Sequence, residues 1–483
     1  MVFSNPYYFL FLAGTLLLLA LPVGVTGKKR LLAAASCLFY ALWDYRYLGL
    51  LLLISLIDYV CAARIAASDS RRVRRAWLLT SIVSNLGVLG YFKYFNFFVD
   101  NLNGLLPHAH SIPHRDILLP AGISFYTFKT MSYVIDVHRR ELGRVRTWMD
   151  YTTFITFFPE LIAGPIVRAS VLLPQLDRDI GLTRARFATG ASAFLLGFTK
   201  KSIADHLAVM VDPVFDAPEV FDGATLAAAV LGYSLQIYCD FSGYSDMAIG
   251  SAKLIGYDLP ENFDMPYASS SITEFWRRWH MTLSFWLRDY LYISLGGNRR
   301  GPFRTYVNLV LTMLLGGLWH GASWNFVLWG GLHGVALALH RLKGTRWRLP
   351  TMAATPLTFA FVSLCWIPFR AVGLDRTLAF LSGLATWRGG VRWISPTLFF
   401  LAALVVLGHA IGRSLFRTEG TRARRFDRAL DALAASLDEG PLTGPYVRLG
   451  MGTWSGAALV FAWTLLAFLL APVSNNPFIY FQF

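Results

Sequence analysis

One zone of the sequence places a histidine where few ionisable residues occur. His320 stands between Trp319 and Gly321 in the apolar stretch 314–334. The ordinary pKa of a histidine side chain lies near neutrality, so it can take a proton from a hydroxyl group and return it. We therefore interpret His320 as a candidate general base. The alternative is a neutral, hydrogen-bonded histidine that only packs helices together.

Glycine pairs flank this histidine on both sides. Gly316-Gly317 and Gly330-Gly331 permit two helices to approach closely, or one helix to break. His333 and His340 follow, seven residues apart on one helical face. No HExxH or similar spacing occurs, so no bound metal is expected. The sequence has neither a GxSxG nucleophile elbow nor a GxGxxG dinucleotide motif.

A second zone covers residues 271–293, with the sequence SITEFWRRWHMTLSFWLRDYLYI. Ser271 and Glu274 have the spacing of a capping box, which predicts that a helix begins here. We expect an interfacial or partly buried amphipathic helix, in which His280 lies among aromatic and charged neighbours. Its expected aromatic anchors are Trp276, Trp279 and Trp286.

A basic cluster accompanies this zone. It consists of Arg277, Arg278, Arg299 and Arg300, the last two in the turn-rich loop 296–301. Guanidinium groups bind phosphate oxygens in bidentate fashion. The cluster is therefore a candidate contact for a phosphate-bearing substrate, although no Walker A pattern is present.

The third zone, residues 236–246, brings two carboxylates, Asp240 and Asp246, into an apolar run that begins near residue 224. Charged side chains in hydrocarbon are costly, so these must face protein or a wet cavity. One interpretation is a hydrogen-bonded cluster that fixes helix packing, and the other is a substrate path. Six residues apart, the carboxylates do not share a helical face, which argues against a paired acid and base.

The elements that must position these residues are apolar helices. Of 483 residues, 55% are hydrophobic and only 15% are charged, against about 25% charged in soluble domains. We predict an all-α integral membrane protein, a polytopic bundle of about ten to twelve transmembrane helices with some short or re-entrant ones. Disorder, a collagen-like fibre and a disulfide-stapled domain are excluded.

The basic residues indicate a topology. The net charge of +15 comes from short runs between apolar segments, as in cytoplasmic loops, and no motif for nucleic acid is present. The runs 28–30 and 71–75 are expected on the cytoplasmic side, with two crossings between them. The first apolar run, 6–25, is expected to be a transmembrane helix rather than a cleavable signal. We expect a single domain over 1–483, with core motifs at 118–340 and a cytoplasmic Arg-rich loop at about 413–450.

Several stretches together resemble one family. They are GYFKYFNFF at 90–98, FFPELIAGPIVR at 157–168, YCDFSGYSDMAIG at 238–250, the block 271–301, LLGGLWHGASW at 314–324 and NPFIYFQF at 476–483. Over nearly its whole length the chain resembles the membrane-bound O-acyltransferase family, in its bacterial alginate O-acetyltransferase branch. The resemblance implies a funnel-shaped bundle with a thinned centre, which a donor enters from the cytoplasm and an acceptor from the other side.

The resemblance also implies roles for individual residues. The histidine in the Trp-His-Gly context, His320, corresponds to the catalytic residue, and His280, in the Arg-Arg-Trp-His context, to a second one. The donor is expected to be an acyl thioester, acetyl-CoA or an acyl carrier protein thioester, with no cofactor bound. Arg277, Arg278, Arg299 and Arg300 are candidates for its phosphates. Asn325 is a candidate to stabilise the oxyanion or orient His320, and Asp240 a candidate for substrate contact.

The implied setting is the bacterial inner membrane. Membrane lipid surrounds such a multi-pass chain, and the acetyl group passes to an exported polysaccharide such as alginate, with a periplasmic acetyltransferase or a secretion complex as partner. Glu160 stands where this branch leads us to expect an uncharged residue or histidine, which suggests another polymer. A non-catalytic transporter of an acyl or glycan substrate is the alternative, but the inverted repeats that favour transport were not found.

Overall fold

The computed structural model describes residues 3, 5–106, 111–142, 145–162, 164–179, 181–344, 349–415, 462–465 and 479. Across these residues the regular structure is helical, apart from one isolated β-bridge between Phe221 and Val391. The prediction of an all-α helical bundle is thereby confirmed. Two compact units are present, the first within residues 1–182 and 251–260 and the second within 183–250 and 261–482.

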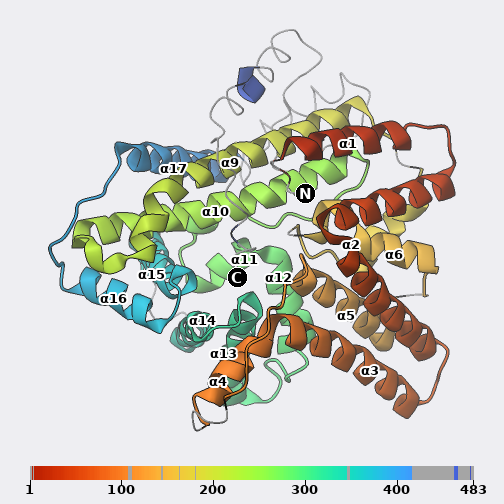
Figure 1. Cartoon of the computed structure of the whole chain (residues 1–483), viewed down its shortest axis with the longest axis horizontal. Helices are drawn as coiled ribbons and strands as arrows, with labels where there is room; N and C mark the ends of the chain where they lie inside the picture. Colours follow the sequence, from red (N-terminus) through yellow and green to blue (C-terminus); the bar gives the residue numbers. More distant parts are fainter. Residues whose placement is uncertain are drawn as a thin grey trace. The chain divides into compact units, whose positions relative to one another are not determined.

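The first unit is built around a long, broken helix. Its helices are α1 (Pro6–Leu19), α2 (Val25–Ala66), α3 (Arg71–Leu89), η1 (Gly90–Tyr94), α4 (Phe95–Asn103), α5 (Ile123–Arg139), α6 (Trp148–Thr156), α7 (Phe158–Leu161), α8 (Ala169–Leu172) and η3 (Leu173–Asp177) (Figure 1). Helix α2 packs against α3, α5 and α6. It is interrupted at Asp44, whose φ of −160° and ψ of 114° are not helical. The break lies between the basic runs 28–30 and 71–75, where the sequence predicts two crossings.

The second unit contains all the predicted site residues. Its helices are α9 (Arg184–Asp216), η4 (Pro218–Val220), α10 (Gly223–Leu254, whose last turn belongs to the first unit), η5 (Pro266–Ala268), α11 (Ile272–Arg278), α12 (Met281–Trp286), η6 (Leu287–Tyr292), α13 (Gly301–His320), α14 (Trp324–Lys343), α15 (Thr351–Arg370), α16 (Leu374–Ala385) and α17 (Pro396–Leu415). Helices α13 and α14 form an intimate hairpin, and α15 packs on α14.

Glycines permit the closest helix contacts of the second unit. A Cβ atom on Gly317 of α13 would lie 2.2 Å from the Phe326 carbonyl oxygen, and one on Gly330 of α14 would lie 2.2 Å from the Met313 carbonyl oxygen. The predicted close approach is therefore confirmed. One glycine of each pair provides it, since a Cβ on Gly331 would meet only the Leu314 side chain, at 3.4 Å.

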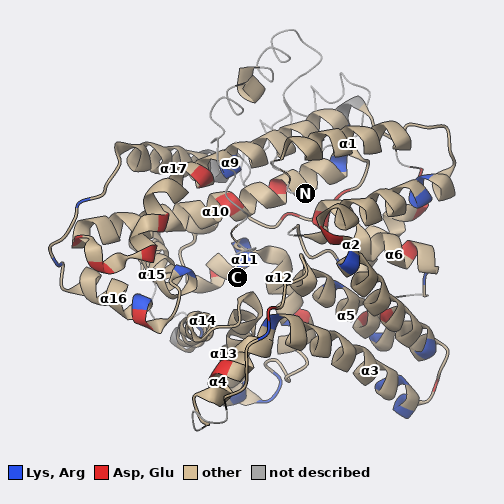
Figure 2. Cartoon of the chain, in the orientation of Figure 1, with Lys and Arg blue, Asp and Glu red and all other residues tan. Residues whose placement is uncertain are grey.

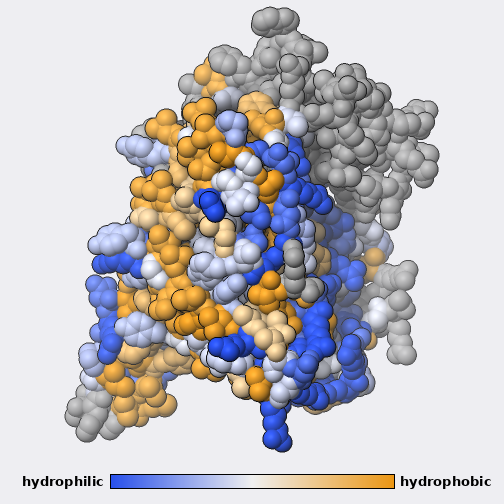
Figure 3. Space-filling view, turned by 90° about the vertical axis from the view of Figure 1, so that its right-hand side faces the viewer, coloured by the Kyte–Doolittle hydropathy of each residue, from blue (hydrophilic) through white to orange (hydrophobic). Residues whose placement is uncertain are grey.

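The surface has features of a protein that contacts lipid. Helices α2 and α15 are long and apolar enough to cross a membrane, by length and composition, and α1 and residues 396–410 of α17 are shorter apolar helices. Figure 3 shows hydrophobic side chains spread widely over one face. The number of crossings stays a prediction. Helix α17 ends at Leu415 and so includes the first three residues of the Arg-rich loop predicted at about 413–450. The rest of that predicted loop lies outside the described residues.

Candidate functional site

His320 lies in an aromatic compartment formed by three helices. It is the last residue of α13, and only 5% of the residue is exposed. The centroid of its ring lies 5.0 Å from that of Trp319, 5.1 Å from that of Trp329 on α14, and 5.3 Å from that of Phe369 on α15. An imidazole in such surroundings is shielded from bulk water, so proton exchange with solvent does not compete with a bound reactant.

The residue after the histidine has a steric requirement. Gly321 ends α13 with extended backbone, and a Cβ atom there would lie 2.0 Å from the Phe326 ring. The chain then re-enters a helix at once, because Ser323 caps α14 by accepting a hydrogen bond from the Asn325 N–H. The Trp-His-Gly pattern therefore has a physical reason. Only glycine at position 321 leaves room for the Phe326 ring, which packs against the turn between α13 and α14.

Asn325 ties helices together. Its amide nitrogen lies 2.6 Å from the Ala371 carbonyl oxygen, 3.1 Å from the Gly373 carbonyl oxygen and 3.2 Å from the Thr377 hydroxyl oxygen. An amide carries only two N–H hydrogens, and these three acceptors already occupy them. The predicted role of Asn325 beside His320 stays a prediction, and the structure shows its amide nitrogen engaged elsewhere.

The helix predicted from Ser271 begins as expected but does not continue. Ser271 Oγ accepts a hydrogen bond from the Glu274 N–H at 3.2 Å, which confirms the start. The expectation of one amphipathic helix through residue 293 is wrong, because α11 ends at Arg278 and His280 adopts a left-handed conformation with φ 42°. Of the two expected placements, interfacial or partly buried, the anchors Trp276, Trp279 and Trp286 fit the second, because all three are buried in the protein.

A neighbouring segment stabilises this break. The Met281 N–H donates to the Asn262 carbonyl oxygen, and the Asp264 N–H donates to the Arg278 carbonyl oxygen, each at 2.9 Å. These bonds replace helical ones that the left-handed residue removes. Histidine is among the residue types that tolerate this region best after glycine. Backbone hydrogen bonds therefore stabilise the break, and His280 at this position is buried.

His280 is completely buried and held by a side-chain amide. Its Nδ1 lies 3.2 Å from Asn262 Oδ1, which also accepts from the N–H and the hydroxyl of Thr282. Because that oxygen is an acceptor, His280 Nδ1 carries the proton and Nε2 is the acceptor nitrogen. The Trp319 ring is a neighbour of both candidate histidines, with centroid distances of 6.4 Å to His280 and 5.0 Å to His320.

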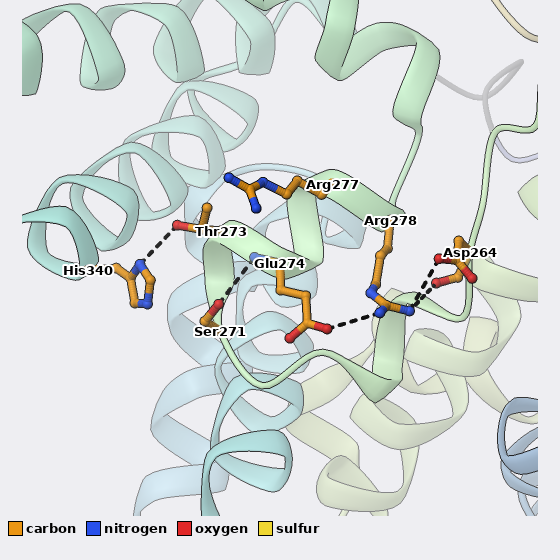
Figure 4. Close-up of a pocket in the computed structure, with 7 residues that line it drawn as sticks. All are labelled: Asp264, Ser271, Thr273, Glu274, Arg277, Arg278 and His340. Atoms are coloured by element: carbon orange, nitrogen blue, oxygen red, sulfur yellow. Dashed lines mark hydrogen bonds and ion pairs between the residues drawn. The ribbon is translucent and has the colours of Figure 1, made fainter. Parts of the chain in front are cut away.

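The predicted basic cluster divides into two parts. Arg277 and Arg278 line an open pocket of about 640 Å³ together with Asp264, Ser271, Thr273, Glu274 and His340 (Figure 4). Arg278 forms ion pairs with Glu274 at 3.1 Å and Asp264 at 3.3 Å, whereas Arg277 extends away from them and is exposed. Arg299 and Arg300 are exposed in the loop before α13 and do not belong to this lining.

Asp240 belongs to an ionic cluster between α9 and α10. Lys201 lies 2.5 Å from an oxygen of Asp205 and 2.9 Å from one of Asp240, and the Ile479 N–H donates to the other oxygen of Asp240 at 2.7 Å. Next to it, Lys200 pairs with Asp246 at 2.6 Å. Figure 2 shows acidic and basic residues along both helices. These contacts match the packing interpretation, and a substrate contact by Asp240 stays a prediction.

Sequence reasoning missed several of these partners. The two lysines were visible as Lys200-Lys201 in an apolar stretch, whereas Asn262 offered no local signal. His333 and His340, predicted on one face, both reach α11. His333 Nδ1 accepts from the Trp276 indole at 3.2 Å, and His340 Nδ1 lies 2.9 Å from the Thr273 hydroxyl.

Glu160, in the first unit, has a direct partner. Its carboxylate forms a buried ion pair with Lys129 of α5, which also donates to the Phe154 carbonyl oxygen. The unexpected carboxylate is thus neutralised inside the unit. Removing only one partner of such a buried ion pair strongly destabilises a protein, because the other charge stays buried without compensation.

Comparison with known proteins identifies the class. The profile of the membrane-bound O-acyltransferase family matches residues 38–368, a range that includes α10, both candidate histidines and the basic pocket. The chain therefore belongs to the membrane-bound O-acyltransferase family. It is an acyltransferase and a membrane protein.

Individual proteins of known name are also similar to this chain. The chain is 41% identical to a protein of Azotobacter vinelandii named probable alginate O-acetylase AlgI, and 39% identical to a protein of the same name from Pseudomonas aeruginosa; both matches cover all of each chain. It is 36% identical to the peptidoglycan O-acetyltransferase of Helicobacter pylori, over 76% of this chain and 78% of that one.

Proposed function

We propose that this protein transfers acetyl groups from a cytoplasmic thioester towards hydroxyl groups of an exported polysaccharide such as alginate. The observation that carries the proposal is the likeness to two proteins named as alginate O-acetylases, which extends over the whole length of this chain and of each relative. The relative named as a peptidoglycan O-acetyltransferase supports acetyl as the group transferred. It also makes peptidoglycan the second candidate polymer.

His320 is the general base in this proposal. Its ring takes the proton of the acceptor hydroxyl, whose oxygen attacks the carbonyl carbon of the thioester. The C–S bond then breaks, and the thiolate takes the proton back from the imidazolium. The aromatic rings of Trp319, Trp329 and Phe369 hold the imidazole edge-on and exclude water, so that the thioester reacts with the acceptor instead of being hydrolysed. His280, whose ring lies 6.4 Å from that of Trp319, is the second histidine of the site in this proposal.

The donor is acetyl-CoA or a carrier-protein thioester, and its phosphates contact the arginines. Arg277 is suited to this because it is exposed at an open pocket and extends away from the carboxylates there. Arg278 has two carboxylate partners, so it contributes less net charge to the pocket. Arg299 and Arg300 offer a second exposed pair in the loop before α13.

The proposed setting is the inner membrane of a bacterium. The chain crosses it several times, surrounded by lipid, and hands the acetyl group to a periplasmic acetyltransferase or to a polysaccharide secretion complex. Membership of an acyltransferase family, together with a histidine buried among aromatic rings, favours chemistry over transport alone. No contact in the described residues favours the non-catalytic transporter.

The proposal is tested by measuring alkali-labile acetate on surface polysaccharide in cells that carry wild-type protein or His320→Ala at equal membrane abundance. We expect the variant to lose the acetate. A matched control is His206→Ala, which changes an exposed histidine of α9 and is expected to retain it. Acetate that stays at the wild-type level in His320→Ala would contradict the role of His320. Acetate found on peptidoglycan instead of an exopolysaccharide would replace alginate with the second polymer.

A further inference from the structure

Trp329 presents a hydrogen-bond donor that the proposed mechanism has not yet used. The residue is only 1% exposed, and its indole nitrogen is buried. Among the residues that the structure describes, no acceptor lies within hydrogen-bonding distance of that nitrogen. Buried donors in folded proteins are nearly always paired, and one that is not paired requires an explanation. A ligand atom that arrives during the reaction is one such explanation.

The position of the ring connects this donor to the reaction. The Trp329 and His320 rings meet edge to face, at an interplanar angle of 88° and a centroid distance of 5.1 Å. A group that reacts at the imidazole is therefore a neighbour of the indole ring. Acyl transfer builds negative charge on the carbonyl oxygen, and donors aimed at that oxygen contribute most when they are fixed beforehand in a water-excluded site.

The surrounding rings hold the indole in place. Trp366 stacks on it at 5.9 Å, with an interplanar angle of 20°, and Phe369 packs at 5.2 Å. On a further side lies His333, at 4.8 Å, itself anchored by the hydrogen bond from Trp276. The indole cannot turn away without displacing these neighbours. It thus meets the requirement of a preorganised donor.

The other donor considered for this role is occupied. The amide nitrogen of Asn325 already faces three protein acceptors. A donor that must break existing hydrogen bonds to reach the substrate loses most of the advantage of preorganisation. Trp329 loses nothing, because its nitrogen has no partner among the described residues to give up.

We propose that the Trp329 indole N–H stabilises the oxyanion formed when the acceptor hydroxyl attacks the acyl thioester. In that step the acceptor oxygen forms a bond to the carbonyl carbon while His320 takes its proton, and the C=O π electrons move to the oxygen that accepts the indole hydrogen bond. The carbonyl then re-forms, the C–S bond breaks, and the thiolate leaves with the proton from His320. The inference rests on the proposed function, and it makes Trp329 a catalytic residue.

The test uses the full-length protein in membranes, with acetyl-CoA as donor and release of free thiol in the presence of alginate oligosaccharide as readout. Trp329→Phe retains an aromatic ring and removes the N–H. We expect kcat to fall about 10²–10³-fold, as for the loss of one oxyanion donor, with KM changed less than about twofold. The matched control is Trp286→Phe, the same change in a buried indole of α12 that packs on Tyr290. It is expected to retain the wild-type kcat.

A second substitution separates the N–H from the shape of the ring. A benzothiophene analogue of tryptophan, incorporated at position 329, replaces the N–H with sulfur and preserves the bicyclic ring. The proposal predicts the same loss of kcat as in Trp329→Phe, and it is overturned if this protein has the wild-type kcat. It is also overturned if Trp286→Phe loses as much as Trp329→Phe. His320→Ala measured in parallel separates the two proposals, because wild-type thiol release by that variant would reject the proposed function itself.

Discussion

Two buried polar regions of the second unit differ in how their polar atoms are satisfied. Between α9 and α10, Lys201 contacts two carboxylates, and Asp240 has a partner at each of its oxygens. Around His320, the neighbours are aromatic rings, and the Trp329 indole nitrogen has no partner among the described residues. In the first region each lysine has a carboxylate partner. The second retains hydrogen-bonding capacity at a place that water does not reach.

This difference indicates which buried polar residues are candidates for a catalytic role. A buried ion cluster resists change, because removing its cation leaves uncompensated charges in a low dielectric. An incomplete aromatic compartment is costly to fold but ready to bind a reacting group. Polarity within the membrane therefore does not by itself mark a catalytic residue. A buried donor that has no acceptor in the protein is the better indication of a catalytic residue.

The largest expected effect separates catalysis from stability. His320→Ala should lower acetyl transfer about 10²–10⁴-fold, the range for loss of a general base. The change removes a ring from an aromatic compartment without leaving a charge unpaired, so the protein should still assemble in the membrane. Transfer rate and detergent-solubilised thermal midpoint, measured on the same preparation, check both parts. A variant that lost activity only because it unfolded would contradict the comparison.

The ionic cluster should behave in the opposite way. Lys201→Met leaves Asp205 and Asp240 buried without their shared cation, which is expected to destabilise the protein by about 3–5 kcal/mol. The triple variant Lys201→Met, Asp205→Asn, Asp240→Asn removes the charges together and should recover much of that loss. Chemical denaturation of the purified protein measures the difference. If the single variant is as stable as the wild type, the cluster is not the structural element described above.

A smaller effect is expected where the hairpin beneath His320 is closest. Gly317→Ala places a Cβ atom 2.2 Å from the Phe326 carbonyl oxygen, so α13 and α14 must separate. Overpacking of this size costs about 1–3 kcal/mol, and a displaced His320 should lower the transfer rate as well. Gly331→Ala is the matched control, with only the Leu314 side chain nearby at 3.4 Å. Equal effects of the two substitutions on rate would argue that helix approach does not position the histidine.

The smallest effect is expected for an ion pair at the surface. Its contribution to stability serves as a reference for that of the buried Lys201 cluster. Arg146, followed by Lys29, hydrogen-bonds to Asp177 and holds the pKa of that carboxyl below its ordinary value. A carboxyl with a depressed folded pKa contributes stability above its unfolded pKa, and this is lost as pH falls through the folded value. Asp177→Asn should cost below about 1 kcal/mol at pH 7. The difference from wild type should start to shrink as the pH falls below about 4 and should vanish only below the lowered folded pKa, as thermal midpoints across pH would show.

Much of the fold follows from local sequence. Apolar runs predicted the all-α architecture, the break in α2 fell between two such runs, and the Ser271 cap marked the start of α11. Each of these depends on residues within a few positions of one another, where helical periodicity and capping geometry act. The glycine pairs around His320 predicted close helix approach for the same reason, since a missing side chain is visible in the sequence itself.

Tertiary structure alone decided how distant residues meet. The helix expected through residue 293 breaks at His280 because Asn262, 18 positions earlier, supplies the hydrogen bonds that the break requires. Lys201 and Asp240 lie on different helices, and only the packing of α9 on α10 makes them partners. The absence of an acceptor for the Trp329 indole nitrogen among the described residues likewise depends on the helices around it. Periodicity specifies which face of a helix is apolar, whereas the pairing of buried polar atoms depends on the helices that come to lie against it.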